Sequence, residues 1–62
     1  MSWTPTGPAP AHEYTLAFRG SLAILSRVQT GRAVTWVLRF AGETIDLGRR
    51  GSFGAADAAL LG

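Results

Sequence analysis

Hydrophobic and polar residues alternate along most of the chain after Glu13, and this period of two indicates β-strands. The first alternating stretch covers residues 13–28, the second and most regular covers residues 33–41, and a short third covers residues 44–47. Gly20 interrupts the first stretch. Because a glycine inside a strand often marks a bulge or a bend, this stretch is either one long bent strand or two short ones.

Glycines also lie between the predicted strands, at Gly31 and Gly42. Glycine supplies the positive φ that tight hairpin connections need, so both positions predict turns. After the third strand, the alanine-rich residues 52–61 predict a short helix, because alanine is the best helix former. Either Ser52 or Gly54 can cap the start of this helix.

The element order β-β-β-α predicts an α+β fold, in which a three-stranded antiparallel sheet carries one short C-terminal helix on one face. Such a short helix is marginal in water by itself, so it must pack on the sheet. The predicted core combines one parity of each strand with one face of the helix. It consists of Leu16, Phe18, Leu22, Ile24, Trp36, Leu38, Phe40, Ile45, Leu47, Phe53 and Leu60.

The N-terminal residues differ in character from the rest of the chain. All three prolines lie within the first ten residues, and proline both fixes φ and lacks a backbone donor. Residues 1–12 are therefore expected to form a flexible, Pro-rich leader, and residues 13–62 a single domain. Trp3 is the exception within the leader, as a candidate anchor onto the domain or onto a partner.

One helix covers only one face of a sheet, so the opposite parity is expected to form an open face. The expected open-face residues are Thr15, Ala17, Arg19, Ser21, Ala23, Leu25, Arg27, Thr35, Val37, Arg39, Thr44 and Asp46. A one-residue slip at Gly20 would exchange the two faces of the residues around it. The half-polar set allows three interpretations: a surface that enters a DNA groove, an interface with a protein or a second copy, or a solvated face with an Arg39–Asp46 ion pair.

Composition excludes several classes of protein. The 62 residues are 47% hydrophobic and 16% charged, which is too apolar for a disordered chain. The absence of cysteine excludes a disulfide framework and a thiolate zinc site. No apolar stretch approaches the about 20 residues of a transmembrane helix, and the N-terminus lacks the pattern of a secretory signal. The expected location is the cytoplasm, with no membrane partner.

Residues that could perform catalysis are sparse. His12 is the single histidine and lies in the leader, so the serines have no evident general base and no metal site is expected. The acidic residues form no evident carboxylate dyad. We therefore expect no enzyme, no cofactor and no small-molecule substrate. The spacing of Gly48, Gly51 and Gly54 could offer backbone N–H groups to a phosphate, or simply form turns beside Arg49.

A resemblance to a DNA-binding family follows from four segments. They are Phe18-Arg19-Gly20, Trp36-Val37-Leu38-Arg39-Phe40, Ile45-Asp46-Leu47-Gly48, and Gly51-Ser52-Phe53 before the alanine-rich helix. Together they resemble the AP2-type DNA-binding domain and the related N-terminal arm-site binding domains of phage integrases. This resemblance implies a three-stranded sheet that lies in the major groove of duplex DNA.

The resemblance implies DNA contacts from Arg19 and Arg39, whose positions match the family pattern. The departures are the inserted Arg49-Arg50 pair and a helix that ends near Leu61, about half the usual length. The net charge is only +2, and every basic residue is an arginine. On charge alone, the set of candidate nucleic-acid-binding residues also includes Arg27, Arg32, Arg49 and Arg50.

In size and composition the chain also resembles small single-domain inhibitors that phages and mobile elements encode, including anti-CRISPR proteins. Such inhibitors occupy the surface of a host protein, in the host cytoplasm. The alternative function is therefore binding to a protein partner, or to a second copy, through the half-apolar face. The candidate partner-binding residues are Leu25, Val37, Arg39 and Trp3.

Overall fold

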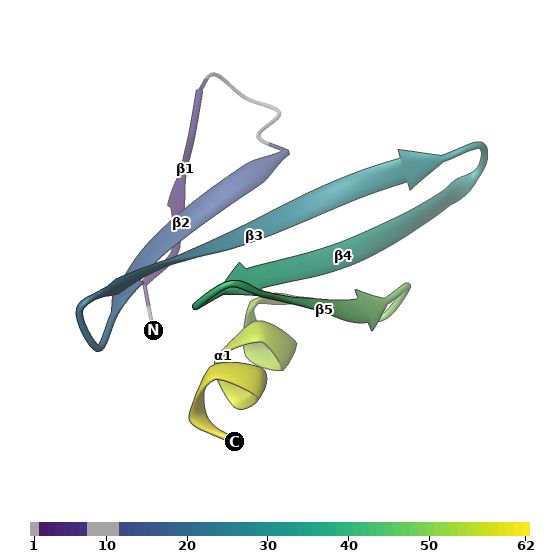
Figure 1. Cartoon of the computed structure of the whole chain (residues 1–62). Helices are drawn as coiled ribbons and strands as arrows, with labels where there is room; N and C mark the ends of the chain where they lie inside the picture. The colour runs from purple at the N-terminus through teal and green to yellow at the C-terminus, as the bar shows by residue number, and fades with distance from the viewer. Residues whose placement is uncertain (1, 8–11) are drawn as a thin grey trace.

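The computed structural model describes residues 2–7 and 12–62, and these form one antiparallel sheet with one helix (Figure 1). The elements are β1 (Thr4–Pro5), β2 (Glu13–Phe18), β3 (Ser21–Thr30), β4 (Ala33–Phe40), β5 (Glu43–Gly48) and α1 (Phe53–Leu61). The sheet order is β1-β2-β3-β4-β5, so each strand pairs with its neighbours in sequence. The α+β class is confirmed, but the expected three-stranded sheet is wrong, because the sheet has five strands.

The first additional strand arises at Arg19-Gly20, where the predicted first stretch divides into β2 and β3. Phe18 pairs with Ser21, which leaves a two-residue loop between the strands. Both loop residues have positive φ, 50° at Arg19 and 78° at Gly20, as a type I′ hairpin turn requires. Glycine adopts this geometry without steric cost, so Gly20 marks a chain reversal rather than a bulge.

This turn exchanges the two faces of β3 relative to the expectation. Because Phe18 pairs with Ser21, every pair in this ladder joins an even-numbered residue to an odd-numbered one. The buried side chains are therefore even-numbered in β2 and odd-numbered in β3. Ala23 and Leu25 are consequently buried in the core, although both were expected on the open face. Leu22 and Ile24, which were expected in the core, lie on the opposite side of the sheet, and Leu22 is 57% exposed.

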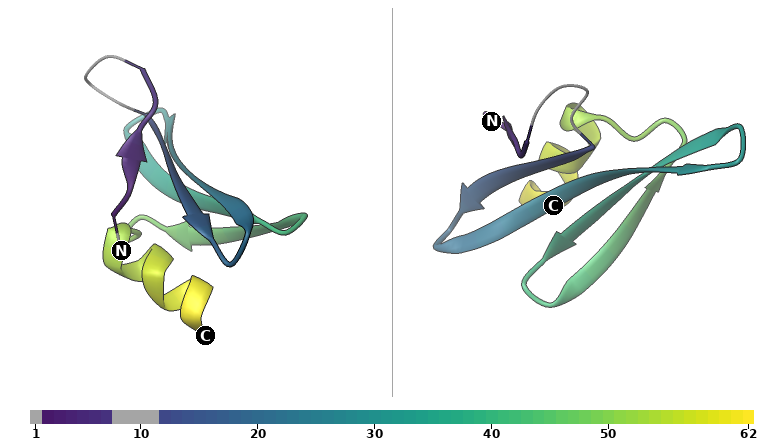
Figure 2. Two further views of the ribbon diagram at one scale, coloured as in Figure 1. Left: turned by 90° about the vertical axis from the view of Figure 1, so that its left-hand side faces the viewer. Right: turned by 90° about the horizontal axis from the view of Figure 1, so that it is seen from above.

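The buried core lies between the sheet and α1, which covers one side of it (Figure 2). It consists of Ala23, Leu25, Leu38, Ala56 and Leu60. Partly buried hydrophobic residues pack against this centre. They are Trp3, Tyr14, Leu16, Phe18, Trp36, Phe40, Ile45 and Leu47, together with Ala59 of the helix. Most of the expected core is therefore confirmed, but Phe53 is 41% exposed.

The helix begins as the sequence indicates. Ser52 is the N-cap, and its side-chain oxygen accepts a hydrogen bond from the backbone N–H of Ala55 at 3.3 Å. Capping satisfies one of the donors that the first turn of a helix leaves without partners. At the other end, the N–H of Gly62 donates to the carbonyl of Ala58.

The second additional strand comes from the expected leader. In β1, Thr4 pairs with Thr15 and Pro5 with Tyr14, so this segment is part of the sheet. Beyond the strand, the backbone N–H of Thr6 donates to the carbonyl of Glu13 at 2.9 Å. The expected leader thus contributes an edge strand, while Pro8 and Pro10 lie outside the described residues.

Trp3 anchors this N-terminal strand to the helix. Its indole Nε1–H donates a hydrogen bond to Oδ1 of Asp57 at 2.9 Å, and its ring stacks on Phe53 with 6.5 Å between centroids. Phe53 also meets Tyr14 edge-on at 4.9 Å and Trp36 at 6.1 Å. Aromatic pairs with such geometry stabilise beyond their buried area. Trp3 therefore docks on its own domain.

The Trp3–Asp57 bond predicts a dependence of stability on pH. The indole hydrogen bond lowers the pKa of the Asp57 carboxyl below its ordinary 3.8. A carboxyl with a lowered folded-state pKa stabilises the fold above its unfolded pKa, and this stabilisation is lost as the pH falls through the folded pKa. We expect Trp3→Phe to lower the free energy of unfolding at neutral pH, and the difference from wild type to shrink below pH ~4.

Urea unfolding at a series of pH values measures this difference. The control is Trp3→Phe in an Asp57→Asn background, where the effect of the substitution should no longer vary with pH. If the free energies of unfolding of the wild type and Trp3→Phe vary with pH in parallel, the Trp3–Asp57 bond makes no contribution to the pH dependence of stability.

Among the residues that the structure describes, no helix is long and apolar enough to cross a membrane.

Candidate binding surfaces

The side of the sheet opposite α1 is uncovered, and we refer to it as the open face. An aliphatic row runs along β3 on this face, formed by Leu22, Ile24 and Val28, with Val37 of β4 beside it. Leu22 is 57% exposed and Val28 44%, while Ile24 and Val37 are half-buried. Hydrophobic surface of this kind often marks an interface.

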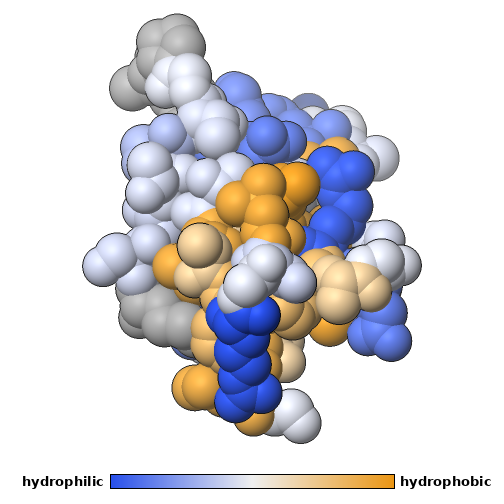
Figure 3. Space-filling model, turned by 60° about the vertical axis from the view of Figure 1, so that its left-hand side comes forward, coloured by the Kyte–Doolittle hydropathy of each residue, from blue (hydrophilic) through white to orange (hydrophobic). Residues whose placement is uncertain are grey.

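The space-filling view shows hydrophobic surface in the middle of one side of the molecule, between hydrophilic side chains (Figure 3). Of the expected partner-binding residues, Val37 and Arg39 do lie on the open face. Leu25 is fully buried on the helix side, and Trp3 is held by the helix, so neither is available there.

The hairpin of β3 and β4 extends beyond its neighbours as a two-stranded arm. Pairing with β2 ends at Ser26, and pairing with β5 ends at Trp36. Residues 28–35 therefore pair only with each other, and we call them the β3–β4 arm (Figure 1). The residues at its tip, from Val28 to Arg32, are all exposed.

Three of the six arginines lie at this arm or its base, and Arg50 follows one of them in the chain. Arg32 lies at its tip, and Arg27 lies at its base, opposite Trp36 in the β3–β4 pairing. Arg49 and Arg50 follow Gly48, which pairs with the same Trp36 from β5. All four arginines are exposed. This arrangement concentrates positive charge at one end of the molecule.

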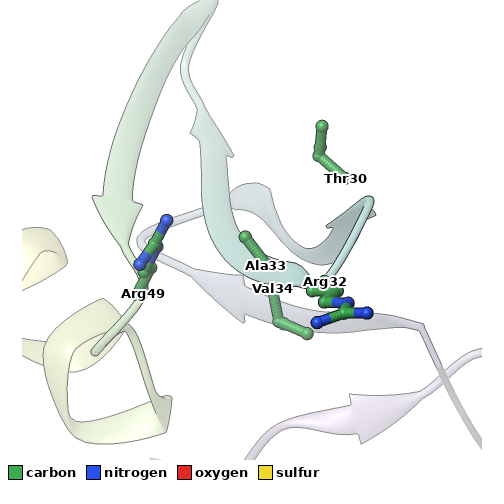
Figure 4. Close-up of a pocket in the computed structure, with 5 residues that line it drawn as sticks. All are labelled: Thr30, Arg32, Ala33, Val34 and Arg49. Atoms are coloured by element: carbon green, nitrogen blue, oxygen red, sulfur yellow. The ribbon is translucent and has the colours of Figure 1, made fainter.

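Arg32 and Arg49 line a common hollow, which we call the basic hollow. Its other lining residues are Thr30, Ala33 and Val34. The close-up shows the two arginines on opposite sides of the hollow, one from the arm turn and one from the end of β5 (Figure 4). No acidic residue lines the hollow. The nearest acid in sequence, Asp46, lies on the open face, and its Oδ1 accepts from the N–H of Gly48 at 2.8 Å.

The remaining two arginines lie apart from the arm. Arg19 is in the β2–β3 turn, where its guanidinium lies 5.0 Å from the centre of the Phe18 ring. Arg39 is exposed on the open face, opposite Ile24 and Thr44 in the two ladders. The expected gathering of Arg19, Arg27 and Arg39 on one face therefore does not occur, because Arg27 has helix-side parity.

The glycines before the helix have structural roles. The N–H of Gly48 bonds to Asp46, and the N–H of Gly51 donates to the carbonyl of Gly48 at 3.3 Å. Gly51 is buried against Trp36. Two of the backbone donors that could have met a phosphate are therefore already bonded within the turn.

The arm was missed in the sequence, although one signal could have found it. The alternating pattern from Ser21 reaches Thr30, whereas its partner β2 begins only at Glu13. With the turn at Gly20, β3 has ten residues and β2 only six, so four must extend past that neighbour. Because the sequence left open whether residues 13–28 form one bent strand or two short ones, this difference in length could not be recognised.

In comparisons with known proteins, no protein-family model, no curated protein and no solved structure matches this chain. The resemblances to the AP2-type domain and to phage-encoded inhibitors therefore stay predictions. Within the described residues, no three histidine or acidic side chains lie together as a metal site would need.

Proposed function

We propose that the protein is a non-enzymatic DNA-binding module that contacts the duplex with the β3–β4 arm and its arginines. The observation that supports this proposal is the position of Arg27, Arg32 and Arg49 around the β3–β4 arm, with Arg50 next to Arg49 in the chain. The proposed partner is duplex DNA, as expected from the sequence. The proposed contact surface is the β3–β4 arm rather than the sheet face.

Shape supports the same choice. The major groove of B-DNA is about 12 Å wide and admits a two-stranded β-ribbon. The arm is such a ribbon, and its exposed tip carries Arg32. Arginine can donate two hydrogen bonds to the major-groove edge of guanine or bind a phosphate. In the proposed complex Arg32 enters the groove, while the arginines at the base contact the phosphates that flank it.

Electrostatics support this choice over binding through the open face. Of the two arginines that the AP2-type resemblance implies, only Arg39 lies on that face, and Asp46 lies on the neighbouring strand. An aliphatic row beside one arginine has little to offer a phosphate backbone. The basic hollow, in contrast, has two arginines and no acid among its lining residues.

The test measures binding to a random-sequence DNA duplex by fluorescence anisotropy at a series of salt concentrations. Each phosphate contact contributes about 0.9 to the slope of log affinity against log salt, so four contacts predict a slope near −3.6. Between 50 and 200 mM salt, that slope weakens binding by roughly 150-fold. We expect Arg32→Ala and Arg49→Ala each to weaken binding, with Arg49→Ala reducing the slope by about 0.9.

Arg19→Ala and Arg39→Ala are the matched controls, since both remove an exposed arginine away from the arm. They are expected to bind like the wild type. If Arg39→Ala loses affinity while Arg32→Ala and Arg49→Ala retain it, the contact is the open face and the arm proposal is wrong. Absence of binding at 50 mM salt would remove DNA as the partner altogether.

A further inference from the structure

We infer that the open face is an interface with a second copy of this chain, packed sheet against sheet with the helices outside. This inference is independent of the proposed DNA contact, because it uses a different surface. The starting observation is the aliphatic row of Leu22, Ile24, Val28 and Val37 on a face that α1 leaves uncovered.

The aliphatic row differs from single exposed hydrophobic side chains, which are common on protein surfaces and do not indicate an interface. Ile24 and Val28 flank Ser26 along β3, and Ser26 pairs with Val37 of β4. Three aliphatic side chains thus flank Ser26 along β3 and from β4, while Glu13 of β2 pairs with Ser26 from the other side, and Leu22 extends the row toward the β2–β3 turn. Face-to-face packing of antiparallel sheets buries such inward rows between them.

The dimensions of the face suit a second copy. Strands β2 to β5 contain six, ten, eight and six residues. At about 4.8 Å between strands and about 3.3 Å per residue, these strands present a face of roughly 20 by 20–30 Å. This area of roughly 400–600 Å² per partner lies below the ~800 Å² of a standard interface and within the range of weak, reversible association.

The open face carries charges of both signs, with Glu13 on β2, Arg39 on β4 and Asp46 on β5, so an arginine of one copy can meet an acid of another. Arg39 of β4 and Asp46 of β5 lie on adjacent strands of this face, and Arg39 pairs in the ladder with Thr44 rather than with Asp46. In a two-fold symmetric interface, residue i of one copy meets residue j of the other, and the reverse. Arg39 of each copy can therefore approach Asp46 of the other at the edge of the aliphatic centre.

The fold also disfavours the other route by which sheets associate, which is pairing of free edges. β5 is the longer of the two edge strands, and it has only six residues. Its pairing with β4 contains a bulge between Trp36 and Val37. Short edge strands, bulges and charged side chains all oppose edge-to-edge pairing, and β5 carries Glu43 and Asp46.

The experiment measures the oligomeric state of the whole chain by sedimentation velocity over a concentration series, from low micromolar to about 0.5 mM, a range typical of modest interfaces. We expect a concentration-dependent dimer for the wild type. Leu22→Glu places a charge in the interface twice per dimer, and it should raise the dimer dissociation constant by at least ~100-fold.

Leu61→Glu is the matched control, because Leu61 is 66% exposed but lies at the end of α1, away from the open face. It should dimerise like the wild type. Circular dichroism of both variants at a concentration where the wild type is monomeric verifies that they remain folded. Should Leu22→Glu prove unfolded, Val28→Glu provides the same test on the arm side of the row, where Val28 is 44% exposed.

Two results would overturn the inference. If the wild type stays monomeric across the concentration series, a second copy does not bind this face. A different protein would then be the candidate partner. A dimer that persists in both Leu22→Glu and Val28→Glu lies on another surface, of which the β5 edge is the first to examine.

Discussion

Leu25→Asp is expected to unfold the protein. Leu25 is fully buried between the sheet and α1, in contact with the core centre that includes Leu38. Removing a buried leucine side chain costs about 2–5 kcal/mol, and placing a carboxylate in its position adds several more. A chain of 62 residues has a free energy of unfolding of roughly 3–9 kcal/mol at ~0.05–0.15 kcal/mol per residue. The expected loss of folding free energy is therefore equal to or larger than the free energy of unfolding of the whole chain.

Leu22→Asp is the matched control, since it changes the same residue type three positions earlier in the same strand. Leu22 is 57% exposed on the open face, so the substitution should leave the fold intact. Far-UV circular dichroism and urea unfolding at low protein concentration compare the two variants. A cooperatively folded Leu25→Asp would mean that the buried parity of β3 is not the one described here.

The Leu25 variant also affects how loss of partner binding is interpreted. From the sequence, Leu25 was a candidate for contact with a partner, so lost assembly in a Leu25 variant would be attributed to a lost contact. In the structure the same loss would follow from unfolding. Substitutions at Leu22 or Val28 test the open face without that ambiguity, because both side chains are exposed.

Gly51→Ala is expected to lower the free energy of unfolding by about 3 kcal/mol or more, since overpacking a tight site forces its neighbours to shift. A Cβ at this position would lie 2.9 Å from Cβ of Leu47 and 2.9 Å from Cγ of Trp36, and closer still to Cβ of Trp36. Contacts below 3.0 Å with atoms next to the backbone cannot be relieved by rotating a side chain. The 49–51 turn would have to move away from β4.

Gly54→Ala is the control for the general effect of replacing glycine. The only neighbour within 4 Å of a Cβ at Gly54 is the Ser52 hydroxyl, at 3.8 Å. Because alanine is favoured over glycine in a helix by up to about 1 kcal/mol, this variant should be neutral or more stable. Thermal and urea unfolding measure both. Equal stability of the two variants would contradict the close packing of the turn on Trp36.

The Gly51 prediction also bears on the proposed function. The turn that Gly51 holds against Trp36 carries Arg49 and Arg50 at the base of the β3–β4 arm. If Gly51→Ala remains folded enough to study, the displaced turn should move Arg49 away from Arg32. Its affinity for DNA would then resemble that of Arg49→Ala, in the absence of any change in charge.

Several elements could be predicted from the sequence because their signals are local. The turns at Gly31 and Gly42 lie where a positive φ is needed, at 61° and 79° respectively. The alternation in residues 33–41 and 44–47 predicted strands within one residue of the bounds of β4 and β5, together with their buried parity. Ser52 was one of two candidate helix caps, beside Gly54, and its hydroxyl is the one that accepts from the first turn.

The candidate surfaces could be predicted only in part. Arg39 and Val37 were correctly placed on the open face, since their strand has an unambiguous pattern. The basic hollow was not foreseen, because Arg32 and Arg49 are 17 positions apart and meet only through the pairing of β4 with β5. β1 was missed as well, since a two-residue strand has no periodicity to detect.

By itself, the sequence determined the hairpin turns at Gly31 and Gly42 and a short C-terminal helix, since each of these depends on residues close together in the chain. It did not determine which side of β3 is buried, and the expectation of Leu22 and Ile24 in the core was wrong. Residues 21–25 are hydrophobic on both parities, with Leu22 and Ile24 on one and Ala23 and Leu25 on the other. Only the tertiary structure decided that question. Leu25 lies opposite Leu38, and α1 packs on that side, so the contacts between distant segments selected the buried parity and left the other exposed.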